Sequence, residues 1–230
     1  MRRLILFDID GTLLSTDGRA GEALGLALAA TFGTAGPIAG YSFAGKTDPQ
    51  IVFELMAPAG IPGEVVKAKL PQALEAYCLR LERTLTPANI RVLPGVHELL
   101  GALERRSDTA LGLLTGNIRA GAAIKLGVAC LGDRFTIGAF GSDDADRDHL
   151  VAVARRRAQR RWGEEFAGTR TVVVGDAEAD VRCARSGGAW SVAVASGKTP
   201  HERLAAMAPD VLLSSLAAPQ AITGVLGPAS

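Results

Sequence analysis

Short apolar runs, each followed by a polar turn, recur along the chain and predict the strands of a buried sheet. The runs cover residues 4–7, 110–114, 137–140, 171–174, 191–195 and 211–213, of which the last two are weaker. The stronger runs do not alternate apolar with polar positions, which is typical of strands that are covered on both faces. Such strands belong to parallel sheets, because parallel sheets carry helices on both sides.

Stretches with helical spacing of apolar residues separate these runs. They cover residues 97–105, 118–126, 150–162 and 179–186. The second stretch stops at Gly127, and we expect this glycine to end its helix. Strands that alternate with helices of this size predict an α/β fold, with a Rossmann-like, doubly wound parallel sheet as its core.

One long segment breaks the alternation. Between residues 17 and 88 no strand-like run occurs, and the helical patterns at 21–32, 49–56 and 62–83 are separated by Gly and Pro. A connection of this length needs structure of its own. We therefore expect an inserted all-helical cap domain at 17–88, and a Rossmann-like core domain made of residues 1–16 and 89–230.

The composition is that of an ordinary globular protein. A chain of 230 residues with 48% hydrophobic residues has enough material for a full core. The 25 Lys and Arg residues balance 24 Asp and Glu residues, so the net charge of +1 gives no sign of nucleic-acid or anionic-membrane binding. The three cysteines lie far apart and outside any CxxC motif, which supports neither a disulfide framework nor a zinc site and predicts reduced, buried thiols. The first apolar run is too short for a signal peptide, so we expect a cytoplasmic protein.

Candidate chemistry gathers where three of the predicted strands end. Asp8 and Asp10 follow the first run, residues 115–117 (Thr-Gly-Asn) follow the second, and Asp176 and Asp180 follow the fourth. Ligands of open α/β sheets bind at the carboxyl ends of the strands, so we expect these side chains to converge. Carboxylates that lie so close repel one another unless a cation is present, and Mg²⁺ is the simplest hard cation with oxygen ligands.

These residue types suit phosphoryl transfer through an aspartate. One carboxylate can attack phosphorus and carry the phosphoryl group. A second carboxylate can protonate the leaving oxygen and later take a proton from water. Hydroxyl and N–H donors hold the transferred group, while a metal neutralises the developing charge.

Three motifs, in this order, resemble the signatures of a known family. Residues 8–12 (Asp-Ile-Asp-Gly-Thr) resemble the first signature of the haloacid dehalogenase-like (HAD) hydrolases. Residues 113–117 (Leu-Leu-Thr-Gly-Asn) are similar to the second signature, and residues 175–180 (Gly-Asp-Ala-Glu-Ala-Asp) are similar to the fourth. The resemblance covers nearly the whole chain, and the segment 17–88 lies where this family has its type-1 cap.

The resemblance implies roles for the acidic residues. Asp8 would be the nucleophile and a Mg²⁺ ligand, and Asp10 would be the general acid/base, with its main-chain carbonyl also on the metal. Asp176 would bind Mg²⁺, and Asp180 would act close to the metal through water. The dehalogenases that the chain resembles lack an acid two residues after the nucleophile, so Asp10 favours a phosphatase.

The resemblance also implies a phosphate-binding set. Thr115, with the N–H groups of Gly116 and Asn117, would bind the phosphoryl group. The family usually places a lysine shortly after the third strand, and this chain has none there. Arg147 is the substitute by position and carries a guanidinium group suited to phosphate, with Lys125 as the alternative.

Other charged residues have simpler interpretations. We expect the acids at positions 143, 144, 146 and 148 to form a solvated turn that pairs partly with Arg147. The arginines between 155 and 161 are expected to form the solvent-facing side of a helix. Lys46 lies in residues 45–48, which resemble the loop that type-1 caps present to the substrate, so it is either a specificity contact or a plain surface lysine.

We therefore predict a Mg²⁺-dependent phosphatase that hydrolyses a small phosphomonoester through an aspartyl phosphate. Its partner would be a small phosphorylated metabolite, with phosphoglycolate as the nearest substrate, and not a nucleic acid or a membrane. A phosphomutase or dehalogenase of the same superfamily is an alternative, as is a phospho-acceptor module without turnover. The sequence leaves the oligomeric state open.

Overall fold

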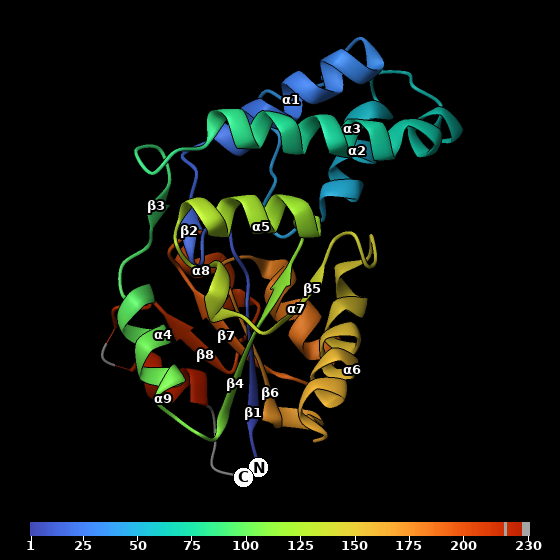
Figure 1. The fold of residues 1–230 in the computed structure, drawn as a ribbon. Helices are drawn as coiled ribbons and strands as arrows, with labels where there is room; N and C mark the ends of the chain where they lie inside the picture. Colours follow the sequence, from blue (N-terminus) through green and yellow to red (C-terminus); the bar gives the residue numbers. More distant parts are fainter. Residues whose placement is uncertain (219, 227–230) are drawn as a thin grey trace.

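A six-stranded parallel sheet forms the centre of the molecule (Figure 1). The computed structural model describes residues 1–218 and 220–226. In spatial order the strands are β5 (Ile137–Phe140), β4 (Thr109–Thr115), β1 (Arg3–Phe7), β6 (Thr171–Gly175), β7 (Trp190–Val194) and β8 (Val211–Leu213). All neighbouring pairs are parallel, and each predicted run forms one of these strands. The predicted Rossmann-like, doubly wound fold is confirmed.

Helices cover both faces of the sheet, which explains the uninterrupted apolar runs. Ile5 and Phe7 of β1 belong to one apolar cluster, whereas Leu4 and Leu6 belong to a second cluster on the other face. The first cluster includes residues of α4 (Val96–Glu104), α5 (Arg119–Val128) and α9 (Ala221–Leu226). The second cluster includes residues of α6 (Leu150–Trp162) and α7 (Glu178–Ser186). Helix α8 (His201–Ala206) packs beside β7.

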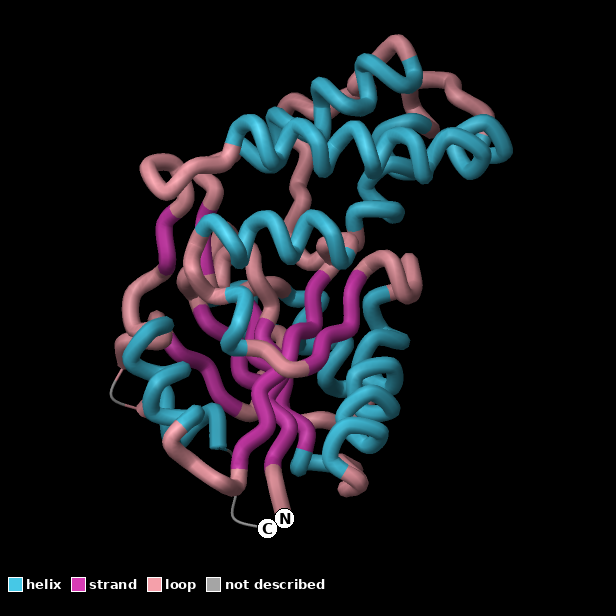
Figure 2. Tube along the Cα trace, viewed as in Figure 1, coloured by secondary structure: helices cyan, strands magenta, loops and turns pink. Residues whose placement is uncertain are grey.

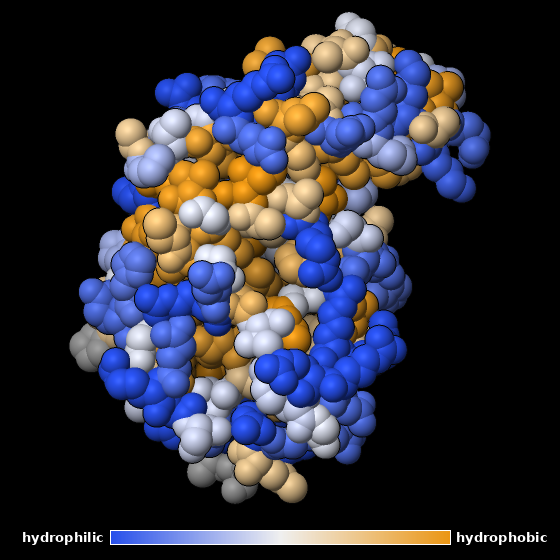
Figure 3. All heavy atoms as spheres, in the orientation of Figure 1, coloured by the Kyte–Doolittle hydropathy of each residue, from blue (hydrophilic) through white to orange (hydrophobic). Residues whose placement is uncertain are grey.

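A third layer lies beyond the carboxyl ends of the strands (Figures 1 and 2). It consists of α1 (Arg19–Phe32), α2 (Asp48–Met56) and α3 (Gly63–Thr84). These helices share an apolar cluster of their own, in which Leu28, Leu55 and Leu81 are fully buried. Ile124 and Val128 of α5 pack against this cluster, and Figure 3 shows apolar residues gathered in the same region.

Two connections join the helical layer to the sheet. The short strands β2 (Leu14–Ser15) and β3 (Arg91–Val92), which the sequence did not predict, pair in antiparallel fashion on these connections. The division into a cap at 17–88 and a core stays a prediction, although the helices lie where it expects them. Within the described residues, none of the helices combines the length and the apolar character that crossing a membrane requires.

The predicted end of one helix is wrong. Helix α5 continues through Gly127 to Val128, and the chain reverses at Cys130, whose φ is +55°. The N–H of Leu131 donates to the carbonyl of Leu126 at 2.8 Å, and that of Cys130 donates to Gly127 at 3.1 Å, as in a Schellman motif. Leu131 is fully buried, so its packing sets where the helix ends. Cys130 is exposed and Cys78 is half-buried, so the expectation that all three thiols are buried holds for Cys183 but not for these two.

The surface charges also differ from expectation. Arg147 does not pair with the acids around it: Asp143 pairs with Arg157, Asp144 with His149, and Asp148 with Arg182. Two arginines of the α6 stripe are half-buried rather than solvent-facing. Arg155 donates to the carbonyl of Gly187 at 2.6 Å, and Arg157 donates to that of Gly138 at 2.6 Å, so these side chains tie α6 to neighbouring segments.

Candidate active site

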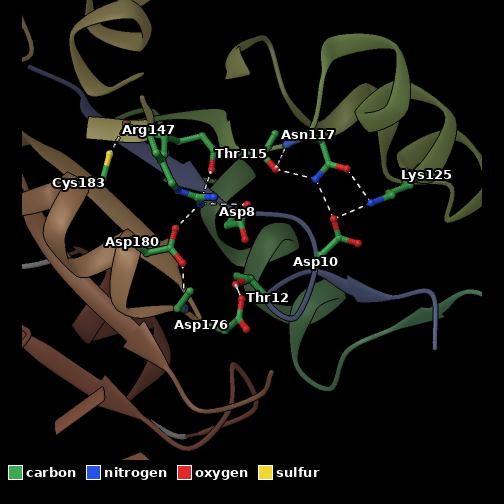
Figure 4. Close-up of polar contacts among 12 residues, drawn as sticks. Asp8, Asp10, Thr12, Thr115, Asn117, Lys125, Arg147, Asp176, Asp180 and Cys183 are labelled. Carbon is green, nitrogen blue, oxygen red and sulfur yellow. Dashed lines mark hydrogen bonds and ion pairs between the residues drawn. The ribbon is translucent and has the colours of Figure 1, made fainter. Parts of the chain in front are cut away.

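The predicted site residues meet at the carboxyl edge of the sheet. Strand β1 lies between β4 and β6, so Asp8 after β1, Thr115 at the end of β4 and Asp176 after β6 are neighbours. They line a cavity of about 370 Å³ between the sheet edge and the helical layer. The cavity is also lined by Asp10, Gly116, Asn117, Arg147, Lys125 and Lys46, but not by Asp180. Figure 4 shows how the side chains of Asp8, Asp10, Thr115, Asn117, Lys125, Arg147 and Asp176 are arranged.

Three buried carboxylates form the floor of the site. Asp8, Asp176 and Asp180 each offer an oxygen atom, and these atoms lie within 4.8 Å of one another. Burial, together with the charges of Asp8 and Asp180, raises the pKa of Asp176 well above its usual range, although Thr12 donates a hydrogen bond to it at 3.2 Å. Oxygen donors with this excess of negative charge are the kind of set that fits Mg²⁺.

Local backbone features hold two of these carboxylates. Asp180, in the first turn of α7, accepts a hydrogen bond from the N–H of Ala177 at 2.9 Å, so the helix start fixes its orientation. Gly11 has a φ of +85°, and a Cβ atom at this position would lie 2.4 Å from Asp176. The glycine of the first motif therefore makes room for the carboxylate that follows β6.

Arg147 is the cation beside Asp8. It lies in a short 3₁₀ turn after β5, and its side chain is 2% exposed. Its Nη2 atom lies 3.2 Å from an oxygen of Asp8 and also forms an ion pair with Asp180. Burial disfavours the charge of Arg147, but Asp180 and Asp8 outweigh this effect and raise the pKa of the guanidinium group.

Burial dominates the electrostatics of Asp8. It raises the pKa of Asp8 from 3.8 to about 6, although the attraction of Arg147 acts in the opposite direction. Asp180 and Asp10 add to the increase because they are negative neighbours. Burial therefore disfavours the ionised form of Asp8 more than Arg147 favours it, and a further cation would favour that form.

Lys125 serves a different carboxylate. Its Nζ atom, on α5, donates to the Oδ2 atom of Asp10 at 2.7 Å and to the Oδ1 atom of Asn117 at 2.6 Å. The amide of Asn117 donates to the same Asp10 oxygen at 2.7 Å and to the hydroxyl of Thr115 at 2.9 Å. Lys125 and Asn117 thus hold one oxygen of Asp10. The Asp10 side chain is still 40% exposed, and the residue lines the cavity.

The positive charge of Lys46 is paired with a neighbouring acid. Lys46 belongs to residues 45–48, which we call the docking loop; this segment follows α1 and ends at Asp48, the first residue of α2. The Nζ atom of Lys46 forms an ion pair with Glu54, accompanied by a contact with the hydroxyl of Tyr41 at 3.0 Å, and lies 4.2 Å from the centre of the Tyr41 ring. The side chain lines the cavity, but its charge is balanced within the helical layer.

The docking loop contacts the phosphate-binding turn that the sequence predicts. The N–H of Asp48 donates to the carbonyl of Gly116 at 2.8 Å, and the carboxylate of Asp48 accepts from the N–H of Ile118 at 2.8 Å. The hydroxyl of Thr47 donates to the carbonyl of Ala145 at 2.8 Å. Asp48 therefore satisfies the N–H of Ile118, the residue that precedes α5, which has no side-chain cap of its own.

Sequence reasoning missed this role of Asp48. Thr47, Asp48 and Pro49 look like an ordinary helix start, and Thr47 does cap α2 by accepting from Gln50 at 3.3 Å. The buried contact depends on α5, which lies far along the chain, so no local pattern indicates it. Burial raises the pKa of Asp48 to about 6, against the attraction of Lys125.

The same arrangement of signatures characterises a known enzyme family. The sequence model of the haloacid dehalogenase-like hydrolases matches residues 5–185, which is most of the chain. The chain belongs to this family. The resemblance inferred from three short motifs is confirmed, and the protein is a hydrolase of the HAD class.

Solved structures share the fold of this HAD-like hydrolase at low sequence identity. CbbY from Rhodobacter sphaeroides, solved in complex with phosphate, has a TM-score of 0.72 and 19% identity, with 98% of this chain and 99% of that chain covered. A hydrolase from Pseudomonas syringae has a TM-score of 0.71 and 22% identity, with 94% of each chain covered. A predicted phosphoglycolate phosphatase from Haemophilus somnus 129pt has a TM-score of 0.67 and 21% identity, with 94% and 95% covered. No match is found among curated proteins.

Proposed function

We propose that this HAD-like hydrolase is a Mg²⁺-dependent phosphatase that acts on a small phosphomonoester. The observation that supports this proposal best is the separation of two carboxylates into two environments. Asp8 lies buried beside Arg147, and Asp10 is held by Lys125 at the edge of the cavity. Two carboxylates in different surroundings suit the roles of nucleophile and general acid/base.

In the first step, an oxygen of Asp8 attacks phosphorus and the bond between phosphorus and the alcohol oxygen breaks. Asp10 gives its proton to the departing alcohol oxygen. Arg147 and the hydroxyl of Thr115 hold the phosphoryl oxygens. The N–H of Asn117 donates to Thr115 at 3.3 Å in this structure, so this proposed phosphate donor begins with a weak internal partner.

In the second step, water attacks the phosphorus of the aspartyl phosphate. Asp10, which is now ionised, takes a proton from this water, and the bond between Asp8 and phosphorus breaks. Phosphate leaves, and both carboxylates return to their starting states. The exposed edge of Asp10 suits this exchange, because the same group must reach first the alcohol and then the water.

The acidic floor would hold the metal. Mg²⁺ would be bound by the side chains of Asp8 and Asp176 and the carbonyl of Asp10, with Asp180 behind them, and would neutralise charge on the phosphoryl oxygens.

The helical layer would act as a cap over this chemistry. The docking loop contacts the turn at Gly116 and the segment at Ala145, and these contacts support a closed arrangement. Opening at the β2 and β3 connections would admit substrate, and closure would exclude bulk water from the first step. The cytoplasmic location and the cap boundaries stay predictions.

The activity is tested by phosphate release from p-nitrophenyl phosphate. We expect turnover with Mg²⁺ and its loss with EDTA, followed by recovery when Mg²⁺ is added back. A screen of phosphorylated metabolites then separates hydrolysis, which releases phosphate, from a phosphomutase, which forms an isomer. A stable acyl phosphate without phosphate release would instead support a phospho-acceptor module and contradict the proposal.

Metal binding should change how stability depends on pH. Because the pKa of Asp8 rises from 3.8 to about 6 and that of Asp176 is also raised, the metal-free folded state binds more protons than the unfolded state across this range. The free energy of unfolding of the metal-free protein should therefore fall as pH rises, by about 3 kcal/mol for Asp8 alone. Mg²⁺ should raise Tm more at about pH 8 than at about pH 5, because it binds the ionised carboxylates.

Asp176→Asn provides the matched control for this measurement, because it removes one ligand charge at nearly constant volume. Thermal unfolding of both proteins with Mg²⁺ and with EDTA is the readout. We expect the variant to lose most of the Mg²⁺-dependent increase in Tm. An equal increase in both proteins, or an increase in the wild type that is larger at low pH, would place the metal elsewhere.

A further inference from the structure

The hydroxyl of Tyr77 is a buried polar group without a partner. Tyr77 lies on α3, is 2% exposed and lines the cavity. Its hydroxyl makes no hydrogen bond within residues 1–218 and 220–226. In the same described part of the chain, the one side-chain atom that is both fully enclosed and without a partner is the Nε of Arg147. The Tyr77 oxygen also lacks a partner, so it is not fully enclosed, and it opens to the cavity that Tyr77 lines.

Tyr77 lines the same cavity as Asp10, the proposed general acid. Burial raises the pKa of Tyr77 well above its usual range, and the negative charges of Asp48 and Asp10 raise it further. Asp10 would protonate the departing alcohol, so the space between it and Tyr77 is where the alcohol part of the substrate would lie. The Tyr77 hydroxyl and Asp10 therefore share the cavity in which the leaving group would lie.

Packing alone does not account for this hydroxyl. The ring belongs to the apolar cluster of the helical layer and approaches Gly121 of α5, where a Cβ atom would lie 3.7 Å from it. A phenylalanine would fill the same space without an unpaired oxygen. A ligand oxygen in the cavity would give this hydroxyl the hydrogen-bond partner that it lacks in the described part of the chain.

The charges around the cavity restrict the leaving group further. Most of the cations that line it have an acidic partner: Lys46 with Glu54, Arg91 with Asp17, Lys125 with Asp10, and Arg147 with Asp8 and Asp180. Lys198 also lines the cavity but is exposed. A leaving group with its own negative charge would thus meet few uncompensated cations, whereas a hydroxyl group would find Tyr77.

We propose that the Tyr77 hydroxyl is a specificity contact for an uncharged, hydroxylated alcohol. It would exchange a hydrogen bond with a hydroxyl group of the leaving group, next to the ester oxygen that Asp10 protonates. The inference rests on the proposed phosphatase function and adds to it the chemical class of the substrate.

Three small esters and one substitution test the proposal. Glycerol phosphate carries free hydroxyl groups, propyl phosphate has the same carbon chain without them, and phosphoglycolate carries a carboxylate instead. We expect the wild type to show its highest kcat/KM with glycerol phosphate. Tyr77→Phe keeps the ring and should lower kcat/KM for glycerol phosphate by about 10-fold or more, while propyl phosphate changes by less than about twofold.

The outcomes distinguish failure of the Tyr77 contact from failure of the proposed phosphatase function. An equal loss for glycerol phosphate and propyl phosphate would show a structural role for Tyr77, and no loss for either would remove the contact; both results overturn the inference while leaving the phosphatase intact. A wild-type preference for phosphoglycolate would overturn the uncharged class. Failure of the wild type to release phosphate from any of the three and from p-nitrophenyl phosphate would instead contradict the proposed function. Unfolding curves of both proteins check that the variant folds.

Discussion

Replacement of Asp8 by Asn should abolish phosphate release while leaving the fold intact. The change removes the nucleophile at nearly constant volume, and we expect a loss in kcat of about 10⁴-fold or more, since an amide does not form the acyl phosphate. Asp10 lies close in sequence, but Lys125 and Asn117 hold it away from the role of nucleophile. Steady-state phosphate release with Mg²⁺ measures the effect.

The same variant carries its own folding control. The buried carboxylate of Asp8 has a pKa of about 6, so at neutral pH its ionised form is a cost to the metal-free protein. Asn lacks this charge, and the Tm of Asp8→Asn in EDTA should be equal to or higher than that of the wild type. Activity within an order of magnitude of the wild type, in a folded variant, would remove Asp8 from the mechanism.

Arg147→Lys should weaken the binding of the phosphoryl group strongly. Arginine presents a planar fork that bonds two oxygens, whereas lysine presents a point charge on a shorter reach. We expect inorganic phosphate to inhibit the variant about 10-fold or more less tightly, with KM rising and kcat falling. Lysine is preferred to alanine here, because removing the charge would leave Asp8 and Asp180 unpaired in a buried site and destabilise the fold.

Lys125→Met is the comparison that separates the two buried cations. Lys125 contacts Asp10 and Asn117 and not Asp8, so its loss should affect substrates that need a proton on the leaving oxygen. Turnover of an alkyl phosphate should fall more than that of p-nitrophenyl phosphate, whose leaving group departs without help. If inhibition by phosphate weakens more in Lys125→Met than in Arg147→Lys, the assignment of Arg147 to the phosphoryl group is wrong.

The sheet and the acidic residues at its edge follow from local patterns. Runs such as residues 4–7 are apolar at every position because both faces of β1 are covered, and together with the polar turns and the helices between the runs this pattern predicts a parallel sheet. The carboxyl ends of parallel strands share one edge, so Asp8 and Asp176 meet although the chain between them is long. Residue type, order and strand direction were sufficient for this part of the site.

The remaining parts depend on contacts between distant segments. The position of Lys125 beside Asp10, the docking of Asp48 on α5 and the opening of Tyr77 toward the cavity all require the helical layer to be placed on the sheet. In sequence each looks ordinary: a lysine in a helix, an acid at a helix start, and an aromatic residue at a core position. The end of α5 was also set by a distant contact, the burial of Leu131, and not by the nearest glycine.

The central claim is that the phosphoryl group passes through the side chain of Asp8. A reaction quenched in acid during the first turnovers, followed by borohydride reduction and peptide mass spectrometry, tests it directly. The account predicts that the peptide holding Asp8 is reduced at that residue to homoserine, that the modification requires substrate, and that it is absent from Asp8→Asn. Reduction at a different carboxylate, or phosphate release in the same samples with no reduced residue, would contradict it.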